Sequence, residues 1–169
     1  MFNTKGSGVK KGGLVAAAVM TIALPFTAQH EGLRMKAYLD PVGIPTICYG
    51  ETKGVELGQV KSRQECDDML AVRLAWFGYQ VDQLVDVPLN ACQHAALSSM
   101  SYNIGLSAFK NSTLLRKLNG GDYDGAAKQF DRWVYAKGRK LPGLIERRKQ
   151  ERKLFENECR KVQGMQTDI

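Results

Sequence analysis

Residues 30–46 have the sequence HEGLRMKAYLDPVGIPT, in which two acids, Glu31 and Asp40, stand nine positions apart. Residues 33–36 continue a helical pattern from upstream, whereas the Pro- and Gly-rich residues 38–47 predict short strands joined by a turn. Glu31 is therefore expected near a helix end and Asp40 on a hairpin. A carboxylic acid and a carboxylate on opposite sides of a cleft are what glycoside hydrolysis requires, although two acids alone prove little.

A longer pattern surrounds the two acids. It has the form Glu-Gly-x5-Tyr-x-Asp-x2-Gly-x2-Thr, followed by x2-Tyr-Gly-x-Thr, and its matching positions are Glu31, Gly32, Tyr38, Asp40, Gly43, Thr46, Tyr49, Gly50 and Thr52. This pattern resembles the phage-type lysozymes of glycoside hydrolase family 24. A second block, residues 112–119 with Arg132-Trp133, residues 142–144 and Arg147-Arg148, resembles the C-terminal half of these enzymes, so the resemblance covers roughly residues 29–160.

The resemblance implies an α+β, mainly helical fold with two lobes, a small β-sheet lobe and a larger helical lobe. In such a fold Glu31 is the general acid to the glycosidic oxygen, Asp40 holds or activates a water on the far face of the sugar, and Thr46 fixes that water. The expected reaction is hydrolysis of peptidoglycan between N-acetylmuramic acid and N-acetylglucosamine, which causes host lysis. A catalytically silent binding module and a lytic transglycosylase are the alternatives.

The same resemblance implies further site residues. Tyr38 and Asn103 are expected to bind substrate, and Arg147 or Arg148 is expected near Glu31, with no means of choosing between the two arginines. An arginine near a carboxylate lowers the pKa of that carboxylate, whereas burial raises it.

One position departs from the family pattern. Many relatives have Gly-Tyr-Gly-His-Thr where this chain has residues 48–52 as Cys-Tyr-Gly-Glu-Thr. Glu51 therefore replaces a histidine just beyond the hairpin, which leaves in doubt a contact between the lobes that the histidine makes in relatives.

Length and charge limit the possible functions. The chain has 169 residues, which predicts a single domain, and a net charge of +7. Residues 128–161 hold twelve Lys/Arg against five Asp/Glu, so the excess charge lies in the C-terminal part. A basic face attracts nucleic acid, a membrane or an acidic polymer, or is simply a solvated helix face. The resemblance favours peptidoglycan as the partner and no nucleic acid.

The N-terminal segment predicts export. Residues 1–11 carry three lysines and no acid, and residues 12–28 follow without a charge. Seventeen helical residues span about 25 Å, against a hydrocarbon core of about 30 Å. This marginal segment resembles the signal-anchor-release segments of certain phage endolysins. We therefore expect residues 1–28 to be a releasable membrane segment and residues 29–169 to be the catalytic domain.

Two alternatives apply to this segment. Signal peptidase could cut after Ala28, but Phe26 would then occupy a position where a small residue is wanted. The segment could also be an ordinary buried helix. With an uncleaved segment, the protein is expected as a monomer at the host inner membrane facing the periplasm, and later as a soluble periplasmic protein.

Local signals predict the remaining helices. Val60–Tyr79 is expected to be a helix that links the lobes, because Ser62 and Glu65 form a capping-box pattern at its start. Trp76 on this helix is expected in the core.

Two more helices are expected further along the chain. Residues 91–102 predict an apolar helix at the centre of the larger lobe, with a stop at Gly105. Residues 144–160 predict the last long helix, with Ile145 among its inward residues. A loop is expected at residues 137–139.

The cysteines are too widely spaced for a zinc site, and neither a metal nor a cofactor is expected. Export permits disulfides, and of the three possible pairings we favour Cys48–Cys66, which closes a short loop, with Cys92–Cys159. Free buried thiols are the alternative.

The two histidines cannot by themselves form a three-ligand zinc site. His94 is expected to be structural. His30, next to Glu31, either tunes that acid or is a surface residue.

Overall fold

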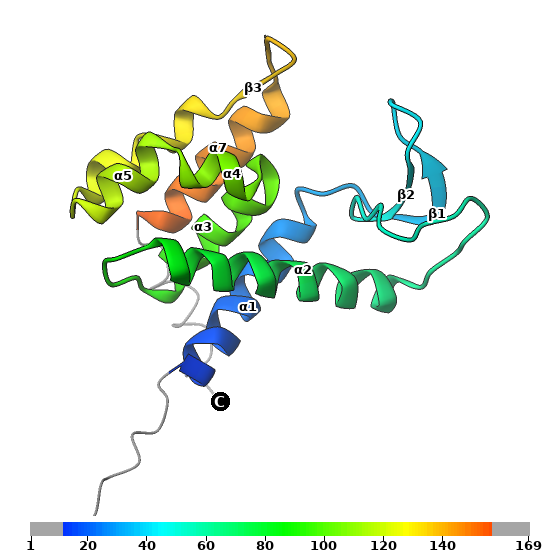
Figure 1. Cartoon of the computed structure of the whole chain (residues 1–169), viewed down its shortest axis with the longest axis horizontal. Helices are drawn as coiled ribbons and strands as arrows, with labels where there is room; N and C mark the ends of the chain where they lie inside the picture. Colours follow the sequence, from blue (N-terminus) through cyan, green and yellow to red (C-terminus); the bar gives the residue numbers. More distant parts are fainter. Residues whose placement is uncertain (1–11, 157–169) are drawn as a thin grey trace, which may run out of the picture.

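The computed structural model describes residues 12–156, with side chains described from residue 18. Its elements are α1 (Gly12–Ala28), β1 (Arg34–Leu39), β2 (Pro45–Cys48), α2 (Arg63–Leu84), α3 (Ala91–Ile104), α4 (Leu106–Lys110), α5 (Thr113–Asn119), α6 (Tyr123–Ala127), the 3-10 helix η1 (Phe130–Arg132), β3 (Tyr135–Ala136), β4 (Arg139–Lys140) and α7 (Pro142–Phe155). Figure 1 shows the β1–β2 hairpin at one end, a cluster of helices at the other, and α2 running between them. The expected α+β, mainly helical, two-lobed fold is confirmed.

Helix α3 is the centre of the helical lobe, as predicted. Cys92 and residues 94–101 are all buried, and α3 packs against α1, α2 and α7. The helix starts with a capping box at Asn90 and ends at Gly105, whose φ of 86° suits glycine. A helix buried on all sides has no polar face for sequence periodicity to reveal.

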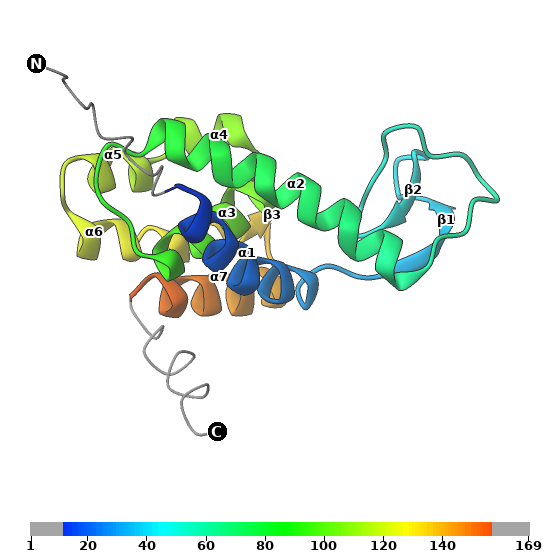
Figure 2. The ribbon, with the colours of Figure 1, turned by 90° about the horizontal axis from the view of Figure 1, so that it is seen from below.

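Helix α1 is part of the same packing. Val19 and Ala23 are buried in a cluster with Ala95 of α3, and Figure 2 shows α1 lying along the helical lobe. Within residues 12–156, no helix is both long enough and apolar enough to cross a bilayer.

The expectation that residues 33–36 continue the helix is wrong. Helix α1 ends at Ala28, and β1 begins at Arg34. The Ala37 amide donates to the Gln59 carbonyl and the Lys61 amide donates to the Met35 carbonyl, so this segment is paired on a second edge as well as with β2. Long-range strand pairing overrides the local helical pattern.

Helix α2 begins with the predicted capping box at Ser62 and Glu65, and it continues five residues beyond the expected end at Tyr79. Trp76, expected in the core, is 51% exposed. Because α2 crosses between two lobes, neither lobe covers its whole circumference.

The C-terminal elements bring one confirmation and further corrections. The loop predicted at residues 137–139 is confirmed at Lys137 and Gly138, which both have positive φ and form the two-residue turn of the hairpin β3–β4, whereas Arg139 belongs to β4. In α7, Ile145 is 40% exposed although it was expected to point inward. Phe155 of the same helix is buried against Phe130.

Candidate active site

Glu31 stands directly after α1, at the edge of a cleft. The Thr27 carbonyl accepts hydrogen bonds from the amides of His30 (2.9 Å) and Glu31 (3.2 Å), which ends the helix and leads the chain toward the hairpin. The Glu31 side chain is 21% exposed, and Arg147 Nη1 donates to its Oε1 at 2.6 Å. The cleft has a volume of about 590 Å³ and is lined by Gln29, His30, Glu31, Asn103, Leu141, Gly143, Leu144, Glu146, Arg147 and Gln150.

Arg147 is held from behind by a buried acid. Its Nε donates to Glu151 Oε1 at 3.0 Å, and its Nη2 donates to the Ser99 carbonyl at 3.3 Å. The Ser99 hydroxyl also donates to Glu151 Oε1, at 2.8 Å. The guanidinium is thus fixed by α3 and α7, with Nη1 directed at Glu31.

Arg148 does not contact Glu31, which decides between the two arginines. It is fully buried, its Nη2 donates to Glu151 Oε1 at 3.0 Å, and its Nε lies 2.7 Å from Glu151 Oε2. Burial lowers the pKa of the Arg148 guanidinium and raises the pKa of the Glu151 carboxyl, while the two arginines oppose that rise. Because its described hydrogen-bond partners, Arg147, Arg148 and the Ser99 hydroxyl, all donate to it, Glu151 is ionised in this arrangement.

Glu151 was missed in the sequence, where it is one acid in a strongly basic segment. The available signal was its spacing, because position 151 lies four residues after Arg147 and shares its helix face.

Asp40 lies on the turn between β1 and β2. Its Oδ1 accepts hydrogen bonds from the amides of Val42 (2.9 Å) and Ile44 (2.8 Å), and the turn includes Gly43 at a φ of 82°. The Asp-Pro-x-Gly sequence is typical of such a turn, in which the Asp side chain bonds the backbone two residues on. Oδ2 has no hydrogen bond to another described residue, so one oxygen stays available.

Thr46 is 3% exposed and lies opposite Tyr38 in the hairpin register. The Thr46 hydroxyl donates to the Ile44 carbonyl at 2.9 Å, so its oxygen can act only as an acceptor toward another group. The guanidinium of Arg34 lies 4.6 Å from the centre of the Tyr38 ring.

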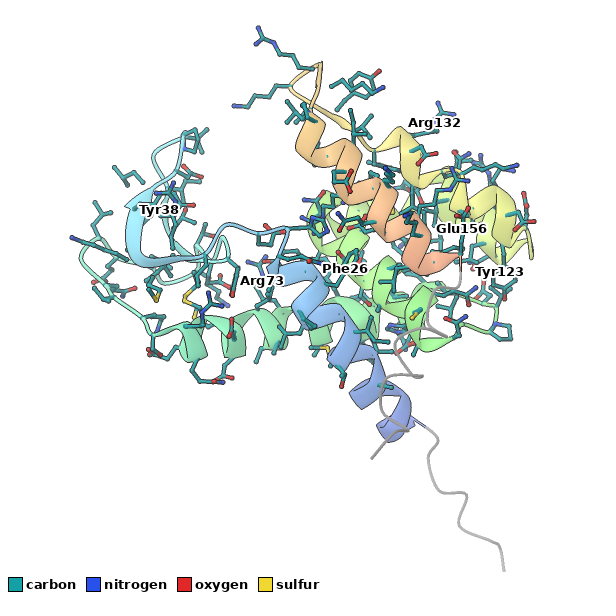
Figure 3. All side chains as sticks on the ribbon, turned by 180° about the vertical axis from the view of Figure 1, so that it is seen from behind. Phe26, Tyr38, Arg73, Tyr123, Arg132 and Glu156 are labelled. Carbon is teal, nitrogen blue, oxygen red and sulfur yellow. A yellow bond between two sulfur atoms is a disulfide. The ribbon has the colours of Figure 1, made fainter. Side chains whose placement is uncertain are left out.

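The two halves of the expected site lie on different lobes. Figure 3 shows Tyr38 on the hairpin lobe, apart from the helical lobe that carries Phe26. Glu31, Asn103 and Arg147 line one cleft, whereas Asp40, Thr46 and Tyr38 do not line it. The structure therefore brings Asn103 and Arg147 to Glu31.

Contacts around α2 connect the lobes. Glu51, in place of the family histidine, pairs with Arg73 of α2 at 3.4 Å, and Arg73 lies over the Tyr102 ring at 5.3 Å. The Tyr102 hydroxyl donates to the Tyr49 carbonyl at 3.1 Å. Burial, followed by the negative charge of Glu31, raises the pKa of Tyr102 to about 12, so the hydroxyl remains a donor.

The predicted Cys48–Cys66 disulfide is present and ties β2 to α2, with a Cα–Cα distance of 5.0 Å. Cys92 is buried at the start of α3, and no described cysteine is a free thiol. Its predicted partner Cys159 lies outside the described residues, so that pairing stays a prediction.

His30 lines the cleft next to Glu31 and packs edge-on against Phe26 at 5.1 Å. Burial, with Arg147 and Arg148 nearby, lowers the pKa of His30 below its ordinary 6.5. The ring is therefore neutral at neutral pH and adds no cation beside Glu31. His94 is structural, as expected, with its Nε2 2.8 Å from Asp82 Oδ1.

Comparison with known proteins gives consistent matches. Residues 28–151 match the family described as Phage lysozyme. The SAR-endolysin of Enterobacteria phage P21 is 39% identical over 145 residues, which are 85% of this chain and 88% of that protein. The endolysin of Salmonella phage P22 is 42% identical over 132 residues, 75% of this chain and 90% of that protein.

Solved structures agree with the sequence matches. A crystal structure of a P22 lysozyme mutant has a TM-score of 0.73 at 39% identity and covers 80% of this chain and 95% of that chain. The muramidase domain of SpmX from Asticaccaulis excentricus has a TM-score of 0.75 at 34% identity, with coverage of 80% and 95%.

Proposed function

Because this chain belongs to the phage lysozyme family and is a lysozyme-type glycoside hydrolase, an endolysin that degrades peptidoglycan, we propose that Glu31 is its general acid. The bond cut is the one between N-acetylmuramic acid and N-acetylglucosamine. The observation that carries this proposal is the placement of Glu31. Its carboxyl is partly exposed at the edge of a cleft, and Arg147, at 2.6 Å, sets the orientation of that carboxyl. A general acid must be both reachable by the substrate and fixed in direction.

Asp40 and Thr46 act from the other lobe. Asp40 has one oxygen tied to the turn and one without a described partner, which suits a carboxylate that orients or deprotonates a water. The Thr46 hydroxyl donates its hydrogen bond to the Ile44 carbonyl, so its oxygen accepts a hydrogen bond from that water. Tyr38 and Asn103 bind the sugar chain from the hairpin and the cleft.

The products test the reaction type. Hydrolysis leaves a reducing N-acetylmuramic acid end, whereas a lytic transglycosylase leaves a 1,6-anhydro end that is lighter by one water. Mass spectrometry of digested sacculi should therefore show only the hydrated ends. Because Asp40 is assigned to the water, NMR of the first-formed product should show the inverted anomer. A retained anomer would make Asp40 the nucleophile.

We further propose that residues 1–28 form a releasable membrane segment and that the enzyme works as a monomer in the periplasm after release from the inner membrane. Two observations support this: residues 12–28 carry no charge, and α1 has a packing site beside Ala95 that it occupies in the folded enzyme. Relatives named SAR-endolysins point the same way. Since Glu31 follows Ala28 by three residues, an inserted segment would hold the general acid at the lipid headgroups.

Cell fractionation tests this second proposal. The full-length chain should occur in both the membrane and the soluble periplasmic fractions. Replacing Gly12 and Gly13 with leucine should strengthen insertion by roughly 1 kcal/mol or more and delay lysis. A shortened soluble form, or unchanged lysis timing in the leucine variant, would count against release.

A further inference from the structure

A second cavity lies on the other side of α7 from Glu31, and its lining is basic. It has a volume of about 440 Å³ and is lined by Asp131, Val134, Lys140, Ile145, Arg148, Lys149, Arg152, Lys153 and Glu156. Five of these side chains are cationic and two are acidic. Glu156 is one of these lining residues, and Figure 3 shows it at the end of α7 on the helical lobe, away from Tyr38.

The cations of this cavity are only partly neutralised. Both acids of the lining form ion pairs with Arg152, which donates to Asp131 at 2.6 Å and to Glu156 at 2.8 Å. Among residues 12–156, Lys140, Lys149 and Lys153 have no ion-pair partner. The cavity therefore has uncompensated positive charge.

A buried cation forms part of the same lining. Arg148 shares the single carboxylate of Glu151 with Arg147, and Arg148 Nη1 has no hydrogen-bond partner among the described residues. A buried donor without an acceptor is uncommon and unfavourable. An anionic group that entered the cavity would lie beside this guanidinium.

The first cleft has the opposite balance, with Glu31 and Glu146 against Arg147. The two cavities approach each other at the start of α7, where neighbouring residues of the chain line different cavities. Leu141 and Leu144 line the first cleft, and Lys140 and Ile145 line the second. One helix, about 10–12 Å in diameter, separates the two.

We propose that the second cavity binds the free carboxylates of the peptide stems of peptidoglycan while the sugar chain occupies the cleft at Glu31. This inference rests on the proposed function. The stem has to pass around α7, and half the circumference of a helix about 10–12 Å wide is roughly 16–19 Å. About five extended residues cover that distance, so a stem of this length that begins at a sugar in the first cleft reaches the second cavity. The acidic first cleft disfavours the stem carboxylates, and the basic second cavity attracts them.

The test compares two soluble substrates, uncross-linked glycan strands with their stems and the same strands after an amidase has removed the stems. The variant Lys149→Gln/Lys153→Gln should raise KM about fivefold on the stem-bearing strands, as expected for two exposed ion pairs, with kcat unchanged. On the stripped strands its KM should equal that of the wild type. The control Lys110→Gln/Lys128→Gln removes the same charge from exposed positions outside both cavities and should change neither value.

Several outcomes would overturn the proposal. They are an unchanged KM on stem-bearing strands, an equal rise on both substrates, and an equal rise in the control variant. Loss of binding to phosphatidylglycerol vesicles together with an unchanged KM would assign the cavity to lipid phosphates instead. Activity of Glu31→Gln on stripped strands would refute the proposed function separately, because that substrate has no stems.

Discussion

Replacing Glu151 with glutamine should strongly destabilise the fold. The carboxylate is fully buried and accepts hydrogen bonds from Arg147, Arg148 and Ser99. Glutamine keeps the shape, but it removes the charge and points an amide donor toward guanidinium donors. Breaking a buried ion pair by removing one partner costs about 3–5 kcal/mol, which corresponds to a fall in Tm of roughly 6–20 °C for a chain of this size.

Urea and thermal unfolding of the purified enzyme at pH 7 measure this effect. The matched control is Glu146→Gln on the same helix, whose exposed carboxylate accepts from Gln150 at 2.8 Å and whose removal should leave Tm close to that of the wild type. If Glu151→Gln unfolded at the wild-type temperature, Glu151 would be protonated in the folded protein, and the claim that an ionised Glu151 holds Arg147 in place would be refuted.

Three further predictions concern the site and its support. Folding lowers the pKa of His30 below 6.5, so the stability linked to its neutral ring is present above about pH 6.5 and is lost as pH falls; between pH 7 and 5 the wild type should lose more Tm than His30→Gln, and parallel curves would exclude this. Arg147→Lys should lower the lysis rate per folded molecule about tenfold or more, because one ammonium cannot bind both carboxylate partners of Arg147. Arg148→Lys should mainly lower Tm. Equal kcat values in the two variants would contradict the assignment of Arg147 as the residue that orients Glu31. Replacing Cys48 and Cys66 with alanine should reduce the free energy of unfolding by about 2–4 kcal/mol in urea titrations, and an unchanged midpoint would contradict a stabilising disulfide.

Local chemistry made the hairpin and several helix ends predictable from sequence. The Asp-Pro-x-Gly turn that orients Asp40 and the capping box at Ser62 depend on residues within four positions of each other. The resemblance added the assignment of Glu31, which spacing alone could not supply.

The errors arise where distant segments decide the outcome. Residues 34–36 belong to strand β1 because the chain near Gln59 and Lys61 pairs with this strand. Trp76 is exposed because α2 passes between lobes, and neighbouring positions on α7, such as Arg147 and Arg148, point about 100° apart around the helix. Which arginine meets Glu31 depends on how α7 docks.

The acids of the basic segment around α7 were also hard to interpret from the sequence, because their burial depends on distant segments. The spacing of Glu151 from Arg147 was a signal, but Glu156 has the same spacing from Arg152, so only the packing of α3 shows which of these acids is buried.

The most direct measurement is the lysis rate of Glu31→Gln on permeabilised cells, beside the wild type and the cleft-lining control Glu146→Gln. Loss of a general acid lowers the rate at least about 10²–10⁴-fold. The account predicts a folded, nearly inert Glu31→Gln and a control with close to wild-type activity. A folded Glu31→Gln that lyses cells at the wild-type rate would contradict the central claim.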